Sequence, residues 1–187
     1  IAHRSGERLR AFVLDGGERA VAFQFFVDTL LDTPCVMGLD EQGTYRCLPG
    51  DARFVGYADA ACTLPVVEAD FGQCGSPHFY RKSVPGTEVC ARTSANAGYE
   101  YTRRQQSVEV GAAHLGAVYE STGSGCTAMA ESPPDVYLVG APADPTRFVA
   151  ATETWVPPGE RAQVHVLEGE GGAMTVDRGR AAATDET

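Results

Sequence analysis

Apolar and polar positions alternate along short segments of this chain, and turn residues interrupt them at close intervals. Phe23, Phe25 and Val27 occupy every second position of one such segment. A period of two is that of a half-buried β-strand. The 21 glycines and 11 prolines follow one another too closely for long helices. The pattern therefore predicts an all-β protein built from short antiparallel hairpins.

A short unit recurs along the chain. It consists of an apolar or aromatic strand, a polar turn, and a cysteine that opens a second strand. Repeats of 20–50 residues indicate an architecture in which each unit is too small to bury its own apolar face. The four cysteine-bearing copies are marked by Cys35, Cys62, Cys90 and Cys126.

The two ends of the chain carry the same type of strand. Residues 8–16 align with residues 161–169, which lead into a fifth, cysteine-free copy over residues 164–176. Hairpins in series must pair or cover their exposed edges. We therefore expect a small five-bladed propeller-like array, with a β-sandwich of two antiparallel sheets as the alternative. Unpaired terminal strands would otherwise dock on a neighbouring molecule and form a fibre.

The length of the chain limits the number of domains, and its charge argues against some classes of partner. A chain of 187 residues suits one domain, and we expect a single repeat domain over residues 8–176, between an N-terminal arm (1–7) and a C-terminal tail (177–187). The formal net charge of -10 argues against nucleic acids and anionic membranes, because both require clustered positive charge. No apolar run approaches the roughly 18–20 residues of a transmembrane segment.

Six cysteines, an even number, favour disulfides and an oxidising compartment. No Cys-x-x-Cys pair and no short Cys–His spacing occurs, which disfavours a zinc site; reduced core thiols are the other alternative. A spacing of twelve residues occurs twice between consecutive cysteines and fits a bond that closes a hairpin. The expected pairs are Cys35–Cys47, Cys62–Cys74 and Cys90–Cys126.

The cysteine-bearing segments over residues 28–35, 43–49 and 57–63 resemble hairpins of uncharacterised secreted or lipoprotein-type proteins of predatory soil bacteria. The likeness extends over residues 8–175 and rests on short motifs. It implies a secreted or cell-surface location, with the signal peptide absent from this chain and removed, and it implies no catalytic residue. The chain differs from that group because its last unit has no cysteine.

The histidines and the serine turn give little indication of catalysis. No two of the four histidines share the spacing of metal ligands. We expect His3 to be solvated, His165 to be a packing residue of a strand, and His78 to be the most accessible. Ser124 lies between glycines but lacks the outer glycines of a nucleophile elbow, so it is interpreted as part of a hairpin turn.

Carboxylates are plentiful, as a glycosidase requires. Asp28, Asp59 and Glu120 recur at equivalent turn positions, where a repeated residue caps a turn or pairs with arginine more often than it builds one active site. We therefore expect no catalytic residue, no metal and no cofactor, and keep a small secreted glycan hydrolase as the alternative. The candidate acids are Asp28, Asp32, Asp40, Glu41, Asp59, Glu68 and Asp70.

Aromatic residues give the better functional indication. Tyrosine and tryptophan combine apolar area with a polar group, so those that share an open face stack on sugars or pack against a partner. Tyr99, Tyr101, Arg103 and Arg104 form the one local cluster of aromatic and basic residues. With Trp155 they are the candidate binding surface; the alternative is an ordinary strand with a solvated face.

Other tyrosines recur in the repeated units, and aromatics at matching positions would favour a soluble glycan-binding module. Together these features predict a secreted, disulfide-stabilised surface protein with a structural, self-assembling or binding role. Its partner would be a second copy of itself or an extracellular glycan. The recurring tyrosines include Tyr57, Tyr80, Tyr119 and Tyr137.

Overall fold

The computed structural model describes residues 3–15, 21–70, 76–92, 99–123, 125–159 and 162–181. Within these residues regular structure consists of strands and one 3-10 turn, η1 (Pro145–Arg147), and none of the helical structure could cross a membrane. The strands are β1 (Leu9–Asp15), β2 (Val21–Asp28), β3 (Thr33–Leu39), β4 (Tyr45–Pro49), β5 (Ala52–Tyr57), β6 (Pro65–Ala69), β7 (Phe79–Ser83), β8 (Val89–Arg92), β9 (Tyr99–Thr102), β10 (Gln105–His114), β11 (Tyr119–Thr122), β12 (Gly125–Ala128), β13 (Val136–Pro142), β14 (Ala151–Gly159), β15 (Ala162–Gly169) and β16 (Met174–Ala181).

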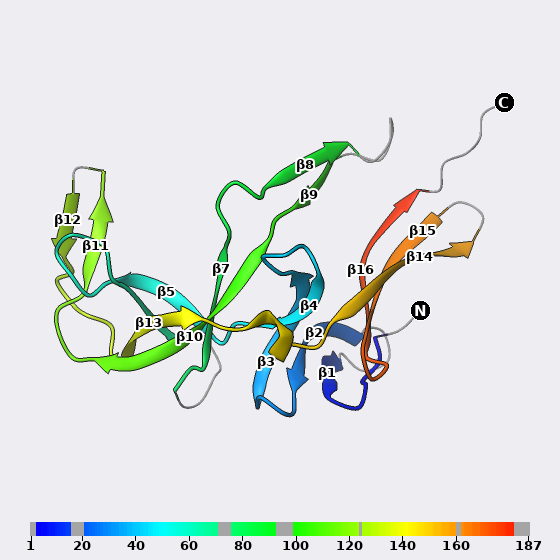
Figure 1. Cartoon of the computed structure of the whole chain (residues 1–187), viewed down its shortest axis with the longest axis horizontal. Helices are drawn as coiled ribbons and strands as arrows, with labels where there is room; N and C mark the ends of the chain where they lie inside the picture. Colours follow the sequence, from blue (N-terminus) through cyan, green and yellow to red (C-terminus); the bar gives the residue numbers. More distant parts are fainter. Residues whose placement is uncertain are drawn as a thin grey trace. The chain divides into compact units, whose positions relative to one another are not determined.

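The chain divides into two compact units, each assembled from segments that are distant in the sequence (Figure 1). From the sequence we expect one repeat domain over residues 8–176, so this division is a finding of the structure. Three of the four boundaries fall within β4, β7 and β10, and the fourth lies between β13 and η1. Unit 1 comprises Ile1–Leu48, Ser83–Gln105 and Pro145–Thr187, and unit 2 comprises Pro49–Lys82 and Gln106–Asp144.

The prediction of an all-β chain of antiparallel hairpins is confirmed. Consecutive strands pair antiparallel in β2–β3, β5–β6, β11–β12 and β15–β16, which correspond to four of the five predicted units. The third unit differs, because β7 joins the sheet of unit 2 whereas β8 pairs with β9. The sheets hold four, seven, three and two strands, and so are not five equal blades.

In unit 2, five strands close into a barrel in the order β5-β6-β13-β10-β7. A ring with an odd number of strands cannot alternate direction throughout, so at least one neighbouring pair must be parallel. The parallel pair is β5–β7, with Ala52 opposite Tyr80. The hairpin β11–β12 extends this sheet, with Tyr119 opposite Tyr57. Beside it, Gly56 is required, because a Cβ there would lie 2.6 Å from the carbonyl oxygen of Tyr119.

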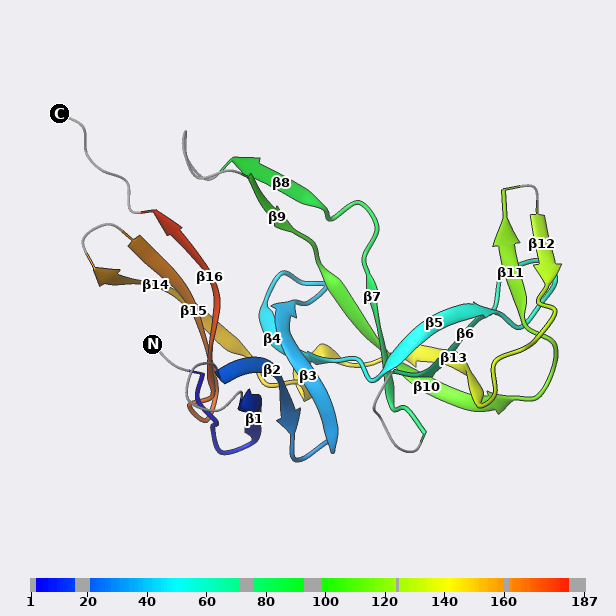
Figure 2. The same cartoon turned by 180° about the vertical axis from the view of Figure 1, so that it is seen from behind.

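Unit 1 combines the four-stranded sheet β1-β2-β3-β4 and the three-stranded sheet β14-β15-β16 (Figure 2). Two isolated bridges join these sheets: Arg46 pairs with Ala150, and Arg4 pairs with Met174. The segment before β1 and the last hairpin of the chain are therefore hydrogen-bonded to each other. The buried cluster of this unit draws on both sheets and contains Leu9, Phe26, Cys35, Cys47, Val149 and Ala173.

The prediction that His3 is solvated is wrong. Its imidazole stacks on Phe23 with ring centroids 4.4 Å apart, and Nδ1 lies 2.9 Å from the hydroxyl of Thr175. Partial burial lowers the pKa of His3, because the charged imidazolium would lose hydration. The error arises because the bridge between Arg4 and Met174 holds this part of the N-terminal arm on unit 1.

Two disulfides join cysteines within the described part of the chain. Cys35–Cys47 joins β3 to β4 with Cα atoms 5.3 Å apart, as its spacing predicts. The predicted pairing of Cys62 with Cys74 is wrong, and so is that of Cys90 with Cys126, because Cys62 is bonded to Cys126. Cys62 lies in the turn after β5, and the pairing of β11 with β5 brings the hairpin that carries Cys126 to that turn. Cys74 and the side chain of Cys90 lie outside the described residues.

The carboxylates of Asp28 and Asp59 cap turns, as the repeats predict, and that of Asp40 does the same. In each, Oδ1 accepts hydrogen bonds from two backbone amides of the turn that follows. Asp28 and Asp40 are buried, and each pairs with a guanidinium, that of Arg8 or Arg46, at 2.7–2.8 Å. A buried carboxylate that accepts backbone amides and faces a guanidinium fixes the turn, whereas one without partners would be costly.

Removing each disulfide is expected to destabilise the protein by an amount set by the loop that it closes. The chain-entropy model gives about 3 kcal/mol for Cys35–Cys47, which are 12 residues apart, and about 4 kcal/mol for Cys62–Cys126, which are 64 apart. Urea unfolding of the double variants C35A/C47A and C62A/C126A measures both losses. Peptide mapping without reductant serves as the control, and a peptide joining Cys62 to Cys74 would contradict the assigned pairing.

Candidate functional site

Part of the predicted binding surface lies outside the described residues. Tyr99 and Tyr101 belong to β9, and their side chains lie outside the described residues. Arg103 is exposed after β9, while a guanidinium nitrogen of Arg104 donates to the carbonyl of Glu41 at 3.3 Å. No bridge or ring contact of the described residues links these positions to Trp155 on β14.

Trp155 packs against a buried histidine. The side chain of His165 is fully buried, which confirms it as a packing residue of β15. Its ring stacks on the indole of Trp155 at 4.8 Å and meets the edge of Tyr45 at 5.7 Å, while Nε2 lies 3.1 Å from the carboxylate of Glu153. The single tryptophan therefore contributes to the packing of the three-stranded sheet.

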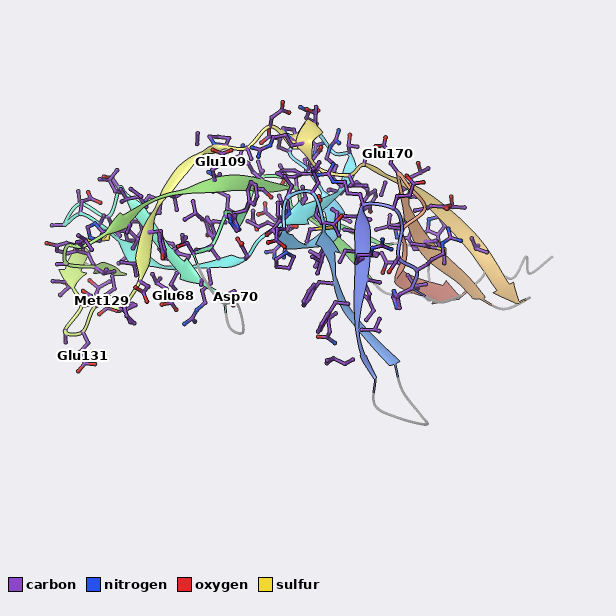
Figure 3. The ribbon with its side chains drawn as sticks, turned by 90° about the horizontal axis from the view of Figure 1, so that it is seen from below. Glu68, Asp70, Glu109, Met129, Glu131 and Glu170 are labelled. Atoms are coloured by element: carbon purple, nitrogen blue, oxygen red, sulfur yellow. A yellow bond between two sulfur atoms is a disulfide. The ribbon has the colours of Figure 1, made fainter. Side chains whose placement is uncertain are left out.

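Several candidate acids of the alternative hydrolase have structural partners. Besides the turn carboxylates, Glu68 on β6 forms an ion pair with Arg53 on β5, and the backbone of Asp70 donates to Asp51 at 2.8 Å (Figure 3). The backbone amide of Leu64 and the hydroxyl of Thr63 lower the pKa of Asp59, which stays ionised as a turn cap.

The remaining acids lie in turns or on an exposed strand. Asp32 lies in the turn before β3 in the left-handed conformation, and Glu41 lies in the turn before β4. Glu120 is exposed on β11 and caps no turn in the way that Asp28 and Asp59 do. Among the described residues no group of three or more His, Cys, Asp or Glu side chains is arranged to hold a metal ion.

Five aromatic residues of unit 2 instead share one face of the barrel sheet. Residues directly opposite each other on paired strands project to the same side. Phe54, Val67 and Tyr137 form one such row across β5, β6 and β13, and Tyr57 lies opposite Tyr119. We call the set of Phe54, Tyr57, Tyr80, Tyr119 and Tyr137 the aromatic face.

A β-bulge makes this arrangement possible on β5. In a regular strand Phe54 and Tyr57 would point to opposite sides, because they are three residues apart. The register shifts between Phe54 and Gly56, so Val55 is an extra residue and returns Tyr57 to the side of Phe54. The two rings meet edge to face with centroids 5.3 Å apart.

The closing strand adds Tyr80 to the same face. Tyr80 lies opposite Ala52, which is two residues before Phe54 on β5. Burial raises the pKa of Tyr80, and the negative charge of an ionised Tyr57 raises it further. Tyr80 therefore stays neutral well into alkaline solution. Both side chains are only half buried, and so are Tyr119 and Tyr137, while Phe54 is 44% exposed.

Polar groups border the aromatic face at Tyr137. The hydroxyl of Tyr137 lies 3.1 Å from that of Ser76. Two residues further along, the ring of His78 is 58% exposed and its Nδ1 lies 3.3 Å from Oδ2 of Asp51. The prediction that His78 is accessible is therefore confirmed, and its buried carboxylate partner was not indicated by any motif.

The tyrosines of the aromatic face carry a signal in the sequence. Tyr57, Tyr80 and Tyr119 lie in the first strand of the second, third and fourth repeated units, at different distances from the cysteine of each unit. That recurrence identifies the residue type and the strand, but not the position within the strand. It does not identify the shared face, which depends on the bulge at Val55 and on the parallel closure of the barrel.

The Y57F variant is expected to lower the pKa of Tyr80, because it removes the negative charge that opposes ionisation of Tyr80. The pKa should stay above the ordinary value of about 10, since burial persists. Ultraviolet titration of the tyrosinate band measures this change, and Y80F identifies the transition by removing it. An unchanged Tyr80 transition in Y57F would show that the two hydroxyls do not interact.

Comparisons of the chain with protein-family models, with curated proteins and with solved structures find no match. The site is therefore interpreted from its own geometry: half-buried tyrosines on one face of a closed sheet, bordered by a serine and an oriented histidine.

Proposed function

We propose that this chain is an extracytoplasmic, disulfide-stabilised binding protein, without catalytic activity, that recognises neutral extracellular glycans through the aromatic face. The observation that carries this proposal is the gathering of four tyrosines and Phe54 on one face of the barrel sheet. Half-buried aromatic rings offer apolar area for the C–H face of a pyranose ring, and the phenol hydroxyls offer hydrogen bonds to its polar edge.

The charge of the chain favours a neutral ligand. A net charge of -10 repels anionic polymers over the range in which charges are not screened by salt. Tyr80 carries no charge at neutral pH, because burial raises its pKa above the ordinary value. A neutral polysaccharide therefore fits this surface better than nucleic acid or an acidic glycan does.

The disulfides support the proposed location. Cys35–Cys47 lies in the core of unit 1, and Cys62–Cys126 holds the hairpin that carries Tyr119 beside the turn after β5. Disulfides persist in oxidising compartments and are rare in reducing ones. A secreted or cell-surface protein would retain both bonds, and with them the geometry of the aromatic face.

Replacing a ring of the aromatic face is expected to weaken glycan binding. Calorimetry with cellohexaose, xylohexaose and chitohexaose gives the wild-type affinity, and Y57A should lower it about tenfold through loss of one aromatic contact. F12A is the matched control, because Phe12 is an exposed aromatic of unit 1. The proposal is wrong if no probe binds at millimolar concentration, or if F12A and Y57A have the same effect.

A second candidate, self-association, is favoured by one edge of unit 1. Phe12, Val13 and Leu14 on the edge strand β1 are 45%, 40% and 52% exposed. Ser5 and Gly6 cover the first half of this edge through hydrogen bonds to Ala11 and Leu9.

Backbone groups alternate in direction along a strand. Those of Leu9 and Ala11 face away from β2, so the backbone of Val13, two residues further on, also faces away from β2. No described residue pairs with it there. An exposed apolar edge is a template for pairing with another strand, and a second copy of β1 would supply one.

Light scattering over a concentration series measures self-association. The mass should rise above 19.8 kDa with concentration in the wild type, and L14K should abolish the rise because a lysine on an edge strand opposes pairing. L115K is the matched control, since Leu115 is 98% exposed on unit 2. A mass that stays at 19.8 kDa at every concentration would exclude this candidate.

A further inference from the structure

We infer that His78, oriented by Asp51, supplies a hydrogen-bond acceptor that binds a hydroxyl group of the saccharide on the aromatic face. This inference rests on the proposed function and extends it, because it names a residue that determines which ligands fit. It also gives a role to the one exposed imidazole that lies in the strand segment leading to Tyr80.

The segment before β7 places His78 on the side of Tyr80. Ser76 and His78 are exposed, whereas Pro77 and Phe79 are buried, so side chains alternate between two sides along this extended stretch. Tyr80 is the next residue in the series of Ser76 and His78.

The contact between the hydroxyls of Ser76 and Tyr137, at 3.1 Å, ties the start of this segment to a second strand of the aromatic face. His78 thus lies between two residues that are each associated with the face, Ser76 and Tyr80. A ligand that covers the rings of Tyr80 and Tyr137 would pass its polar edge over this segment.

Asp51 fixes the orientation of the imidazole. Its carboxylate is 6% exposed and accepts the backbone amides of His78 and Phe79 at 3.0 and 2.7 Å. Oδ2 also lies 3.3 Å from Nδ1 of His78. A carboxylate accepts only, so Nδ1 must carry the proton of a neutral ring.

In that tautomer Nε2 carries a lone pair and no proton. A second nitrogen whose role is fixed by the partner of the first is a common device for setting the tautomer of histidine. The side chain of His78 is 58% exposed, and in this scheme Nε2 accepts a hydrogen bond from outside the protein. Asp51 is a positioning residue in this scheme and does not touch the ligand.

The chemistry of an acceptor selects the ligand. A saccharide hydroxyl donates a hydrogen bond to Nε2, while its ring stacks on the tyrosines. A deprotonated carboxylate or phosphate has no proton to donate and would oppose the lone pair. The oriented histidine and the negative net charge of the chain therefore both favour neutral, hydroxyl-bearing ligands.

Two substitutions test the two ring nitrogens of His78 separately. Glutamine places an amide group near the position of Nε2, whereas asparagine reaches only the position of Nδ1. We expect H78N to weaken binding of the hexasaccharide that binds the wild type by about five- to tenfold, the effect of one hydrogen bond. H78Q should stay within about threefold of the wild type. H114N is the matched control, because His114 is a histidine of unit 2 whose Nε2 contacts the carbonyl of Ala117.

The outcomes distinguish this inference from the proposed function. If the wild type binds no probe, the proposed function fails; if Y57A weakens binding and H78N does not, only the role of His78 fails. Should H78N not fold, nitrogen NMR of the wild-type imidazole gives the answer. The Nε2 resonance should move on addition of the saccharide, and an unmoved resonance would overturn the inference.

Discussion

The architecture of unit 2 depends on the odd number of strands in its barrel. Five strands cannot close into a ring with antiparallel neighbours throughout, and the chain satisfies the constraint with one parallel pair, β5–β7. Parallel neighbours cannot be joined by a tight turn, so the chain passes through β6 before it returns as β7. The closure sets Tyr80 beside the strand that carries Phe54 and Tyr57, and so it creates the aromatic face from segments that a simple series of hairpins would keep apart.

Several acids of the described residues serve the fold, because backbone amides occupy their carboxylates. Asp28, Asp40 and Asp51 each accept at least two backbone amides, and an exposed acid, Asp59, does the same in its turn. A carboxylate with such partners is fixed in place, because its oxygens accept the hydrogen bonds that shape the turn. These acids determine the shape of the loops, and Asp51 extends that role to the imidazole of His78.

Local patterns in the sequence predict the strands and most of the hairpins, because alternation and turn residues act over a few positions. The pair Cys35–Cys47 is local as well, since it joins neighbouring strands. The bond between Cys62 and Cys126 is not, because it depends on β11 pairing with β5 across 62 residues, from Tyr57 to Tyr119. A regular spacing of cysteines cannot indicate such a pairing, and for the same reason it cannot indicate two units built from interleaved segments.

The candidate site likewise depends on both local sequence and the pairing of distant strands. Neighbouring residues in a strand point to opposite sides, so a cluster that is contiguous in the sequence, such as the one around Tyr101, is a weak indication of a shared surface. Recurrence of one residue type in the first strand of several units is a stronger one, and it identifies Tyr57, Tyr80 and Tyr119. The face that they share still depends on one extra residue, Val55: without it, Tyr57 would lie on the opposite side of β5 from Phe54. One bulge and one parallel strand pair therefore place tyrosines from different repeated units on the same surface.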